Sequence, residues 1–135
     1  IGSSLLLAKD IMVVKQKLPL IEYKKNLKDA LKIMSQKKLG VVVVVKNKYI
    51  AGLLTDGDLR REIKFISKKN NIEQFMTKKP MVVNENMTAS KALAIMNEKK
   101  ITSLLVVSDA DFKKKNNQKL KGIIHIHSLL QHGLQ

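Results

Sequence analysis

The chain has 135 residues, 44% of them hydrophobic, so it can bury the core of one compact domain or of two tightly joined halves. It contains no cysteine, which excludes disulfides and thiolate metal sites and fits a reducing, cytoplasmic environment. No apolar stretch approaches the roughly 20 residues of a membrane-spanning helix, so we expect no membrane partner. The chain starts at Ile1 without an initiator methionine or a signal pattern, and we interpret it as a piece of a longer protein.

The formal net charge of +15 comes almost entirely from lysine, because Arg60 and Arg61 are the only arginines. Nucleic-acid-binding surfaces usually combine arginine with aromatic residues, and aromatics make up only 4% of this chain. We therefore expect no nucleic acid partner. Two interpretations of the lysines stay open: a solvated surface, and attraction of small ligands that carry phosphate.

The first half of the chain opens with a lead-in, Lys9–Met12, followed by a short strand after Pro19. An apolar stripe with the spacing i, i+3, i+4, i+7 then predicts an amphipathic helix with Asn26 as its N-cap; the stripe is Leu27, Ala30, Leu31 and Met34. The β-branched run Val41–Val45 predicts a buried strand. A tight polar turn leads from it into Tyr49–Leu54 as the hairpin partner, and residues 58–66 predict a second helix.

The second half repeats this order after a polar linker over residues 67–71 and a lead-in, Glu73–Met76. Its helix has Thr88 as the expected N-cap and the stripe Ala89, Ala92, Leu93 and Met96, an offset of 62 residues from the first copy. Each helix ends in a lysine pair, where positive charge suits the helix dipole. The offset grows to 70 at Gly122, because residues 108–121 form a longer polar loop whose composition suggests mobility.

The segment Thr55-Asp56-Gly57-Asp58 ends the second strand of the first half and opens a helix. One interpretation is a capping box, in which the hydroxyl of Thr55 and the carboxylate of Asp58 satisfy backbone N–H groups. The other is a ligand site, because a helix N-terminus attracts anions and a carboxylate there can accept hydrogen bonds from two ribose hydroxyls. The two interpretations are compatible.

The second copy changes this chemistry, since His125, His127 and Ser128 replace Thr55, Gly57 and Asp58. Serine cannot make a charge-assisted bond to ribose, worth roughly 1.5–3 kcal/mol. The two histidines alternate at a strand end, so they could share a face, either as polar lining of a ligand cleft or in a structural role. We assign no metal site, because no carboxylate or thiolate ligand lies nearby in sequence.

The doubled strand–helix–strand–strand–helix unit, with its ending Gly52-Leu53-Leu54-Thr55-x-x-Asp58, resembles the CBS domain over about residues 8–130. The resemblance implies an α/β (α+β) fold in which two pseudo-symmetric βαββα repeats pack into one module. We place repeat one at residues 8–67 and repeat two at residues 72–132. In this family a cleft between paired repeats binds adenosine-type or other nucleotides.

By this likeness, Thr55 contacts phosphate or ribose, and Asp58 contacts the ribose hydroxyls. Arg60 and Arg61 follow this turn: either both are solvated residues of the helix, or one of them, which we predict to be Arg61, clamps a ligand phosphate. The walls that would hold the base come from the starts of the central strands and from the residues before the two prolines. The remaining ligand-binding residues that we predict are Leu18, Leu39, Gly40 and Val41 for the first half-site, and Lys79, Ile101, Thr102, Ser103, His125 and His127 for the second.

The strings at residues 52–61 and 121–130 are similar to the C-terminal CBS pair of bacterial arabinose-5-phosphate isomerases, although family members usually carry an acidic residue where this chain has Ser128. In those enzymes an N-terminal sugar isomerase domain, absent from this chain, converts ribulose 5-phosphate to arabinose 5-phosphate for Kdo and lipopolysaccharide synthesis. We find no acid–base pair, nucleophile elbow or catalytic phosphate loop here, so we predict no catalytic residue.

We therefore interpret the chain as a regulatory module that senses a nucleotide-type effector and controls or assembles the missing isomerase domain. CMP-Kdo is the favoured effector, because its acidic sugar suits lysines, and an adenine nucleotide is next; no cofactor is expected. The alternatives are a ligand-free module that forms a homodimer or higher homo-oligomer, and a CBS pair of another enzyme that binds AMP or ATP.

Overall fold

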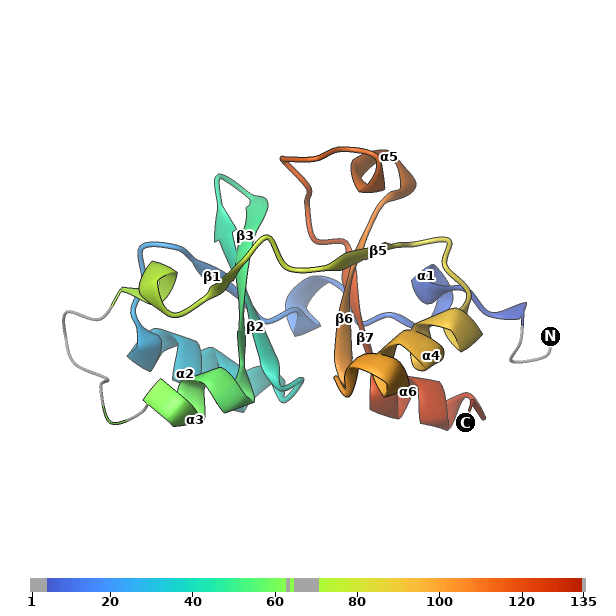
Figure 1. Cartoon of the computed structure of the whole chain (residues 1–135), viewed down its shortest axis with the longest axis horizontal. Coiled ribbons are helices and arrows are strands. Elements are labelled where there is room, and N and C mark those ends of the chain that lie inside the picture. Colours follow the sequence, from blue (N-terminus) through green and yellow to red (C-terminus); the bar gives the residue numbers. More distant parts are fainter. Residues whose placement is uncertain (1–4, 63, 65–70, 135) are drawn as a thin grey trace. The chain divides into compact units, whose positions relative to one another are not determined.

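A computed structural model describes residues 5–62, 64 and 71–134, and the chain divides into two compact units (Figure 1). The repeat-one unit is Pro19–Pro80, and the repeat-two unit combines Ile1–Leu18 with Met81–Gln135. Both are mixed α/β structures with one small sheet each. The expected order of short strand, helix, strand, strand and helix is confirmed in both units.

The repeat-one unit has a four-stranded sheet in the order β1-β2-β3-β4. Its strands are β1 (Leu20–Glu22), β2 (Val41–Lys46), β3 (Tyr49–Thr55) and β4 (Thr77–Lys78). β1 is parallel to β2, and the other pairs are antiparallel. The predicted hairpin is confirmed: Asn47 and Lys48 connect β2 to β3 with φ of 52° and 73°, the left-handed pair that a two-residue hairpin turn requires.

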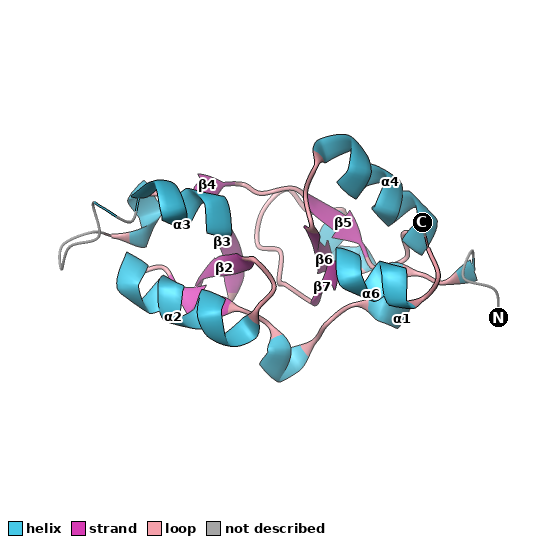
Figure 2. Ribbon diagram, turned by 90° about the horizontal axis from the view of Figure 1, so that it is seen from below, coloured by secondary structure: helices cyan, strands magenta, loops and turns pink. Residues whose placement is uncertain are grey.

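The two helices of this unit, α2 (Leu27–Lys37) and α3 (Asp56–Glu62), pack against the sheet and against each other (Figure 2). The core contains alternate residues of β2, such as Val42 and Val44, together with Leu27 and Leu59 from the helices. α3 begins two residues before the predicted start, and residues 63 and 65–70, which include the predicted helix end and most of the linker, lie outside the described residues.

The repeat-two unit has a three-stranded sheet in the order β5-β6-β7, from β5 (Val82–Asn84), β6 (Ser103–Val107) and β7 (Gly122–His125). Its helices are α1 (Ala8–Ile11), α4 (Ala89–Lys99), α5 (Asp109–Phe112) and α6 (Ile126–Gln131). Parallel β5–β6 and antiparallel β6–β7 pairing repeats the pattern of β1 to β3. No helix in the described part of the chain is long and apolar enough to cross a membrane.

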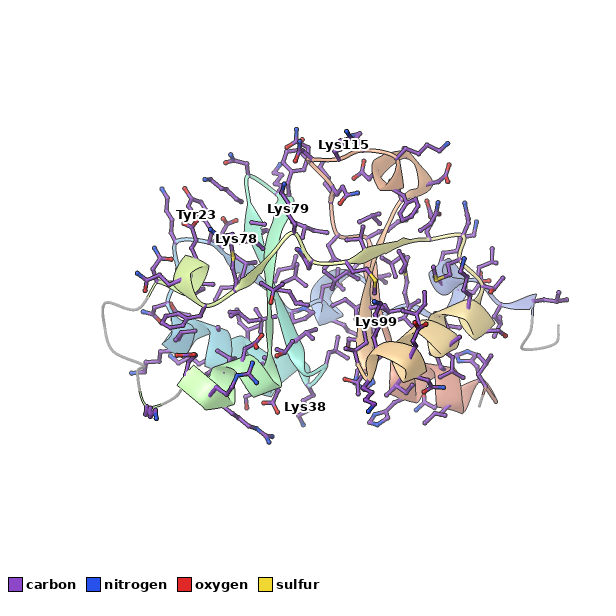
Figure 3. The ribbon with its side chains drawn as sticks, viewed as in Figure 1. Tyr23, Lys38, Lys78, Lys79, Lys99 and Lys115 are labelled. Atoms are coloured by element: carbon purple, nitrogen blue, oxygen red, sulfur yellow. The ribbon has the colours of Figure 1, made fainter. Side chains whose placement is uncertain are left out.

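Equivalent caps define the long helix of each unit. Asn26 Oδ1 accepts from Asp29 N–H (3.0 Å) before α2, and Thr88 Oγ1 accepts from Lys91 N–H (3.2 Å) before α4, which confirms both predicted N-caps. At the other ends, Lys38 and Lys100 adopt the left-handed conformation, with φ of 60° and 55°. Both lysine pairs therefore lie at helix C-termini, as predicted, and Figure 3 labels Lys38 and Lys99 there.

The lead-in of each repeat belongs to the unit built around the other repeat. Val13 pairs with Ile123 of β7, and Thr77 of β4 pairs with Leu53 of β3. A glycine makes each approach close enough: a Cβ on Gly122 would lie 2.3 Å from Met12 Sδ, and one on Gly52 would lie 2.3 Å from Met76 Sδ. Each sheet is thus completed by a segment that precedes the opposite repeat in sequence.

The polar segment between β6 and β7 is more structured than its composition suggested. Ser108 Oγ accepts from Asp111 N–H (3.1 Å) and caps α5, while Gln118 donates to the carbonyl of Asp111 (2.9 Å). The hydrogen bond with Lys121 is the first cause that holds the pKa of Glu85 below its usual value, and the bond from Asn84 does the same for the pKa of Asp109. This network attaches the segment to the end of β5.

The contact between glycine and methionine predicts a specific intolerance to an added methyl group. We expect Gly52→Ala to lower the free energy of unfolding by about 1–3 kcal/mol, because Met76 and the Thr77 carbonyl must move. Chemical denaturation measures this loss. Gly57→Ala is the matched control, since its Cβ would meet nothing closer than 3.6 Å, and it should be near neutral. Equal effects of the two substitutions would contradict the account.

Candidate functional site

The turn from β3 into α3 forms a reciprocal capping box. Thr55 Oγ1 accepts from Asp58 N–H (3.1 Å), and Asp58 Oδ2 accepts from Thr55 N–H (3.1 Å). The capping interpretation of this motif is therefore confirmed. Because the side chain of Asp58 is still 21% exposed, capping leaves part of its carboxylate accessible to a ligand.

Two arginines of α3 fold back onto the aspartates of this turn. Arg61 Nη2 forms an ion pair with Asp58 Oδ1, and Arg60 Nη2 lies 2.7 Å from Asp56 Oδ2. Their side chains are 70% and 78% exposed, so both pairs are solvent-screened and contribute little to stability. Arg61 therefore stands beside Asp58 on the exposed side of the turn.

The start of β2 lies directly beside this turn. Val41 pairs with Thr55, and the carbonyl of Gly40 accepts from Asp56 N–H (3.0 Å). Gly40 has a φ of 74°, a conformation that glycine adopts without strain. The structure therefore brings together Gly40, Val41 and Thr55 with Asp58 and Arg61, while Leu39 precedes them along the chain.

The repeat-two unit builds the same frame with different side chains. The carbonyl of Thr102 accepts from Ile126 N–H (2.9 Å), and Ser103 pairs with His125, in the same relation as Gly40 to Asp56 and Val41 to Thr55. Ile101 is exposed next to them. Here the cap is a histidine, because His125 Nδ1 accepts from His127 N–H (3.2 Å) at the start of α6.

The two histidines lie against each other, with ring centroids 4.6 Å apart in an edge-on arrangement. β7 ends at His125 and His127 is already helical, so a helical turn rather than strand alternation brings them together. Burial, and second the charge of His127, lower the pKa of His125. Among residues 5–62, 64 and 71–134, no three histidine or carboxylate groups cluster closely enough to hold a metal ion.

Ser128 faces a hollow of about 420 Å³ that sequence reasoning missed. The lead-in of repeat one forms the rest of its lining, and two lysines, Lys15 and Lys17, are among the lining residues. The position that holds a carboxylate in the first unit thus holds a neutral hydroxyl near two cations in the second. The packing of the lead-ins had a signal in the sequence: a methionine recurs in both lead-ins, as Met12 and Met76, and a glycine recurs in both contacting strands, as Gly122 and Gly52.

Two predicted site residues lie where the chain crosses between the units. Leu18 is the last residue of the N-terminal segment of the repeat-two unit, and Lys79 precedes Pro80, the last residue of the repeat-one unit. Leu18 is buried, and Lys79 is exposed with a φ of 50°. Their assignment to the two half-sites stays a prediction.

Comparison with known families gives a match to the CBS domain model at residues 8–65 and again at residues 72–134. The chain is a CBS domain pair. The uncharacterized protein RP505 of Rickettsia prowazekii is 34% identical over 99% of this chain and 40% of its own length. Arabinose 5-phosphate isomerase KdsD of Yersinia pestis is 36% identical, again over 99% of this chain and 40% of its own length. The CBS pair thus spans about two fifths of these relatives.

Solved CBS pairs share this fold over nearly their whole length. The crystal structure of CBSX2 in complex with AMP is 27% identical, with a TM-score of 0.76, and the match covers 95% of this chain and 96% of that one. The CBS pair of protein MJ0100, in complex with 5′-methylthioadenosine and S-adenosyl-L-methionine, matches with a TM-score of 0.76 at 19% identity over 94% of both chains. At that identity the second likeness shows the fold alone.

The lowered pKa of His125 predicts a pH dependence of stability. The unfolded chain takes up a proton near pH 6.5 and the folded chain only at lower pH, so the free energy of unfolding should fall as the pH drops from about 7. His125→Asn keeps a capping acceptor but should flatten this slope between about pH 7 and 5.5. Denaturant titrations at several pH values measure it.

The pKa values of Glu85, Asp109 and Asp111 are held below the ordinary values of these carboxyl groups, so their titration falls at more acidic pH and does not mask this window. A wild-type slope in His125→Asn would contradict the assignment.

Proposed function

We propose that this CBS pair is a regulatory module that binds a nucleotide-type effector at its strand ends. The observation that carries the proposal is the partly exposed carboxylate of Asp58, held at a helix N-terminus beside the start of a neighbouring strand. Helix N-termini favour phosphate, and a carboxylate accepts the paired hydroxyls of ribose. The AMP complex of CBSX2, a CBS pair of the same fold, supports a nucleotide as the ligand class.

In the first half-site, Asp58 would accept the ribose hydroxyls, and Thr55 with Arg61 would bind phosphate. Gly40 and Val41, which pair next to this turn, would line the base together with Leu18 and Leu39. Binding would require Asp58 to exchange its ion pair with Arg61 for ligand hydroxyls. That exchange frees the guanidinium for the phosphate, so one rearrangement serves both contacts.

The second half-site would favour a more acidic ligand. Ser128 lacks the carboxylate that would accept hydrogen bonds from ribose hydroxyls, and Lys15 and Lys17 line the hollow that Ser128 faces. Ile101, Thr102, Ser103 and the two histidines would line the base side, with Lys79 near the chain crossing. This distribution of charge supports CMP-Kdo, whose sugar carries a carboxylate, as the favoured effector, with an adenine nucleotide as the next candidate.

The parent protein is proposed to be an arabinose-5-phosphate isomerase of the cytoplasm, with the CBS pair controlling or assembling its catalytic domain. The KdsD relatives support this context, because they match the chain along almost all of its length and extend well beyond it. Effector binding would bias the isomerase by a coupling free energy of about 1–3 kcal/mol, a typical allosteric range.

The effector model makes a prediction for Asp58→Asn. Asparagine keeps an acceptor for Thr55 N–H, so the capping box survives, but it loses the charge that strengthens the ribose contacts. Affinity for AMP or CMP-Kdo, measured by calorimetry, should fall about tenfold or more while the melting temperature stays near that of the wild type. Asp58→Ala should lose both affinity and about 1 kcal/mol of stability.

Unchanged affinity in folded Asp58→Asn would contradict the ribose role of this carboxylate. His132→Asn serves as a matched control on another helix end and should bind the effector like the wild type.

A second candidate function, ligand-free homodimerisation, is favoured by one observation: α6 exposes 52% of Leu130. A dimer built through this helix should dissociate in Leu130→Glu, because a charge would replace an apolar contact. Sedimentation of both proteins measures this. A dimer that depends on Leu130, combined with no thermal shift from AMP, ADP, ATP, CMP or CMP-Kdo, would favour assembly over sensing.

A further inference from the structure

The outer edge of β1 carries backbone groups without a partner strand. β1 is the edge strand of its sheet. In a parallel pair, alternate residues of a strand direct their backbone groups toward the partner strand. Pro19 and Tyr23 do so here, because the Pro19 carbonyl and the Tyr23 N–H form hydrogen bonds with β2. Leu20 and Glu22 therefore direct their backbone groups outward. Of these, the Glu22 carbonyl accepts from Lys25 N–H. Within the described part of the chain, both backbone groups of Leu20 and the N–H of Glu22 are left for another chain.

The equivalent strand of the repeat-two unit has a neighbour at its end. Asn84 of β5 donates to Asp109 Oδ1 (2.8 Å), and Glu85 Oε2 accepts from Asp109 N–H (2.9 Å), so α5 is attached there. In the repeat-one unit the corresponding connection is only the tight turn at Asn47 and Lys48, which supplies no such helix. Exposed strand edges of this kind are templates for pairing with another chain.

Six exposed lysines surround this edge, and none forms an ion pair with a described residue; they are Lys24, Lys25, Lys28, Lys32, Lys46 and Lys48. Lys24 and Lys46 instead lie 5.8 and 4.7 Å from the ring centre of Tyr23, which follows β1 (Figure 3). At the offset of 62 residues, repeat two has Met87, Ser90 and Ala94 at the positions of Lys25, Lys28 and Lys32. The charge is therefore a property of this edge and not of the repeat.

The surface on both sides of β1 is hollowed and apolar at its centre. One hollow of about 430 Å³ lies between β1 and α2. Lys25, Lys32 and Ile33 are in its lining, and so are two acidic residues, Glu22 and Asp29. A second, of about 330 Å³, is lined by β1 with Val45 and Lys48. Leu20 contributes to both and is 41% exposed, although Ile21 beside it is buried. An added strand would have room for its side chains on each side.

We propose that the β1 edge, defined as Leu20–Glu22 with the six lysines, binds an extended acidic segment of a partner protein by strand addition. Alternation in the added strand would place apolar residues on the face of Leu20 and carboxylates on the α2 face, near Lys25 and Lys32. Backbone hydrogen bonds with Leu20 and Glu22 would fix the register. A second copy of this chain is disfavoured as the occupant, because it would oppose lysines with lysines.

A short synthetic peptide of alternating glutamate and valine, labelled with a fluorophore, tests the proposal. Fluorescence anisotropy with the 135-residue chain should show binding that weakens as salt is added, and the amide NMR signals of Leu20 and Glu22 should shift. Leu20→Glu should weaken binding about tenfold or more, because a charge would replace the central apolar contact. Phe112→Glu, at a comparably exposed apolar residue, should bind like the wild type.

Two control peptides separate strand addition from simple attraction of charge. A peptide of the same sequence with methylated backbone nitrogens should bind about tenfold more weakly, since it cannot donate the ladder hydrogen bonds. A lysine–valine peptide should not bind measurably. Equal binding of the methylated peptide, or amide shifts remote from β1, would overturn the proposal. A dimer abolished by Leu20→Glu would assign this edge to a second copy instead and would also overturn it.

Discussion

The close contact between a glycine and a lead-in methionine is the constraint on which both units depend. Gly52 receives Met76, and Gly122 receives Met12, at distances that leave no room for a Cβ. Since each methionine precedes the opposite repeat in sequence, neither repeat completes its sheet without a segment from elsewhere in the chain. The two repeats therefore depend on each other's lead-ins, and the chain passes from one unit to the other at residues 18–19 and 80–81.

The same backbone frame holds two different chemical surfaces. In both units the first strand residue pairs with the last residue of the hairpin, and a carbonyl before that strand receives the first N–H of the helix. On this frame one unit places Asp58 and Arg61, and the other places His125 and Ser128 with two lysines nearby. A duplicated scaffold with divergent side chains thus gives each half-site its own chemistry.

The open edge of β1 and the attached end of β5 follow from one difference in loop length. The longer segment between β6 and β7 supplies α5, which is hydrogen-bonded to Asn84 and Glu85, while the two-residue turn after β2 supplies nothing comparable. The lysines around β1 form no ion pair with a described residue, whereas three of the lysines in the longer segment, Lys113, Lys114 and Lys121, do. Charge and an open edge therefore occur together in one unit only.

Local signals made most of the fold predictable from sequence. Asn26 and Thr88 cap their helices by accepting hydrogen bonds from N–H groups three residues further along the chain. Val41–Val45 is buried because every residue in the run is apolar. The exchange of lead-ins was not predictable in this way, because it joins residues that are distant in sequence: Met76 and Gly52 are 24 positions apart, and Met12 and Gly122 are 110 positions apart. α5 was missed because its cap, Ser108 with Asp111, lies in a polar stretch without an apolar stripe.

For the candidate site, the sequence indicated the residue types but not their states. Asp58 was expected to cap or to bind ribose, and only the structure shows that it caps, pairs with Arg61 and keeps part of its surface exposed. The central claim is that this turn and the strand beside it bind a nucleotide. Amide NMR mapping with AMP tests it most directly: the account predicts saturable shifts at Gly40, Val41 and Thr55–Asp58, and a titration that leaves these amides unmoved while shifting others would contradict it.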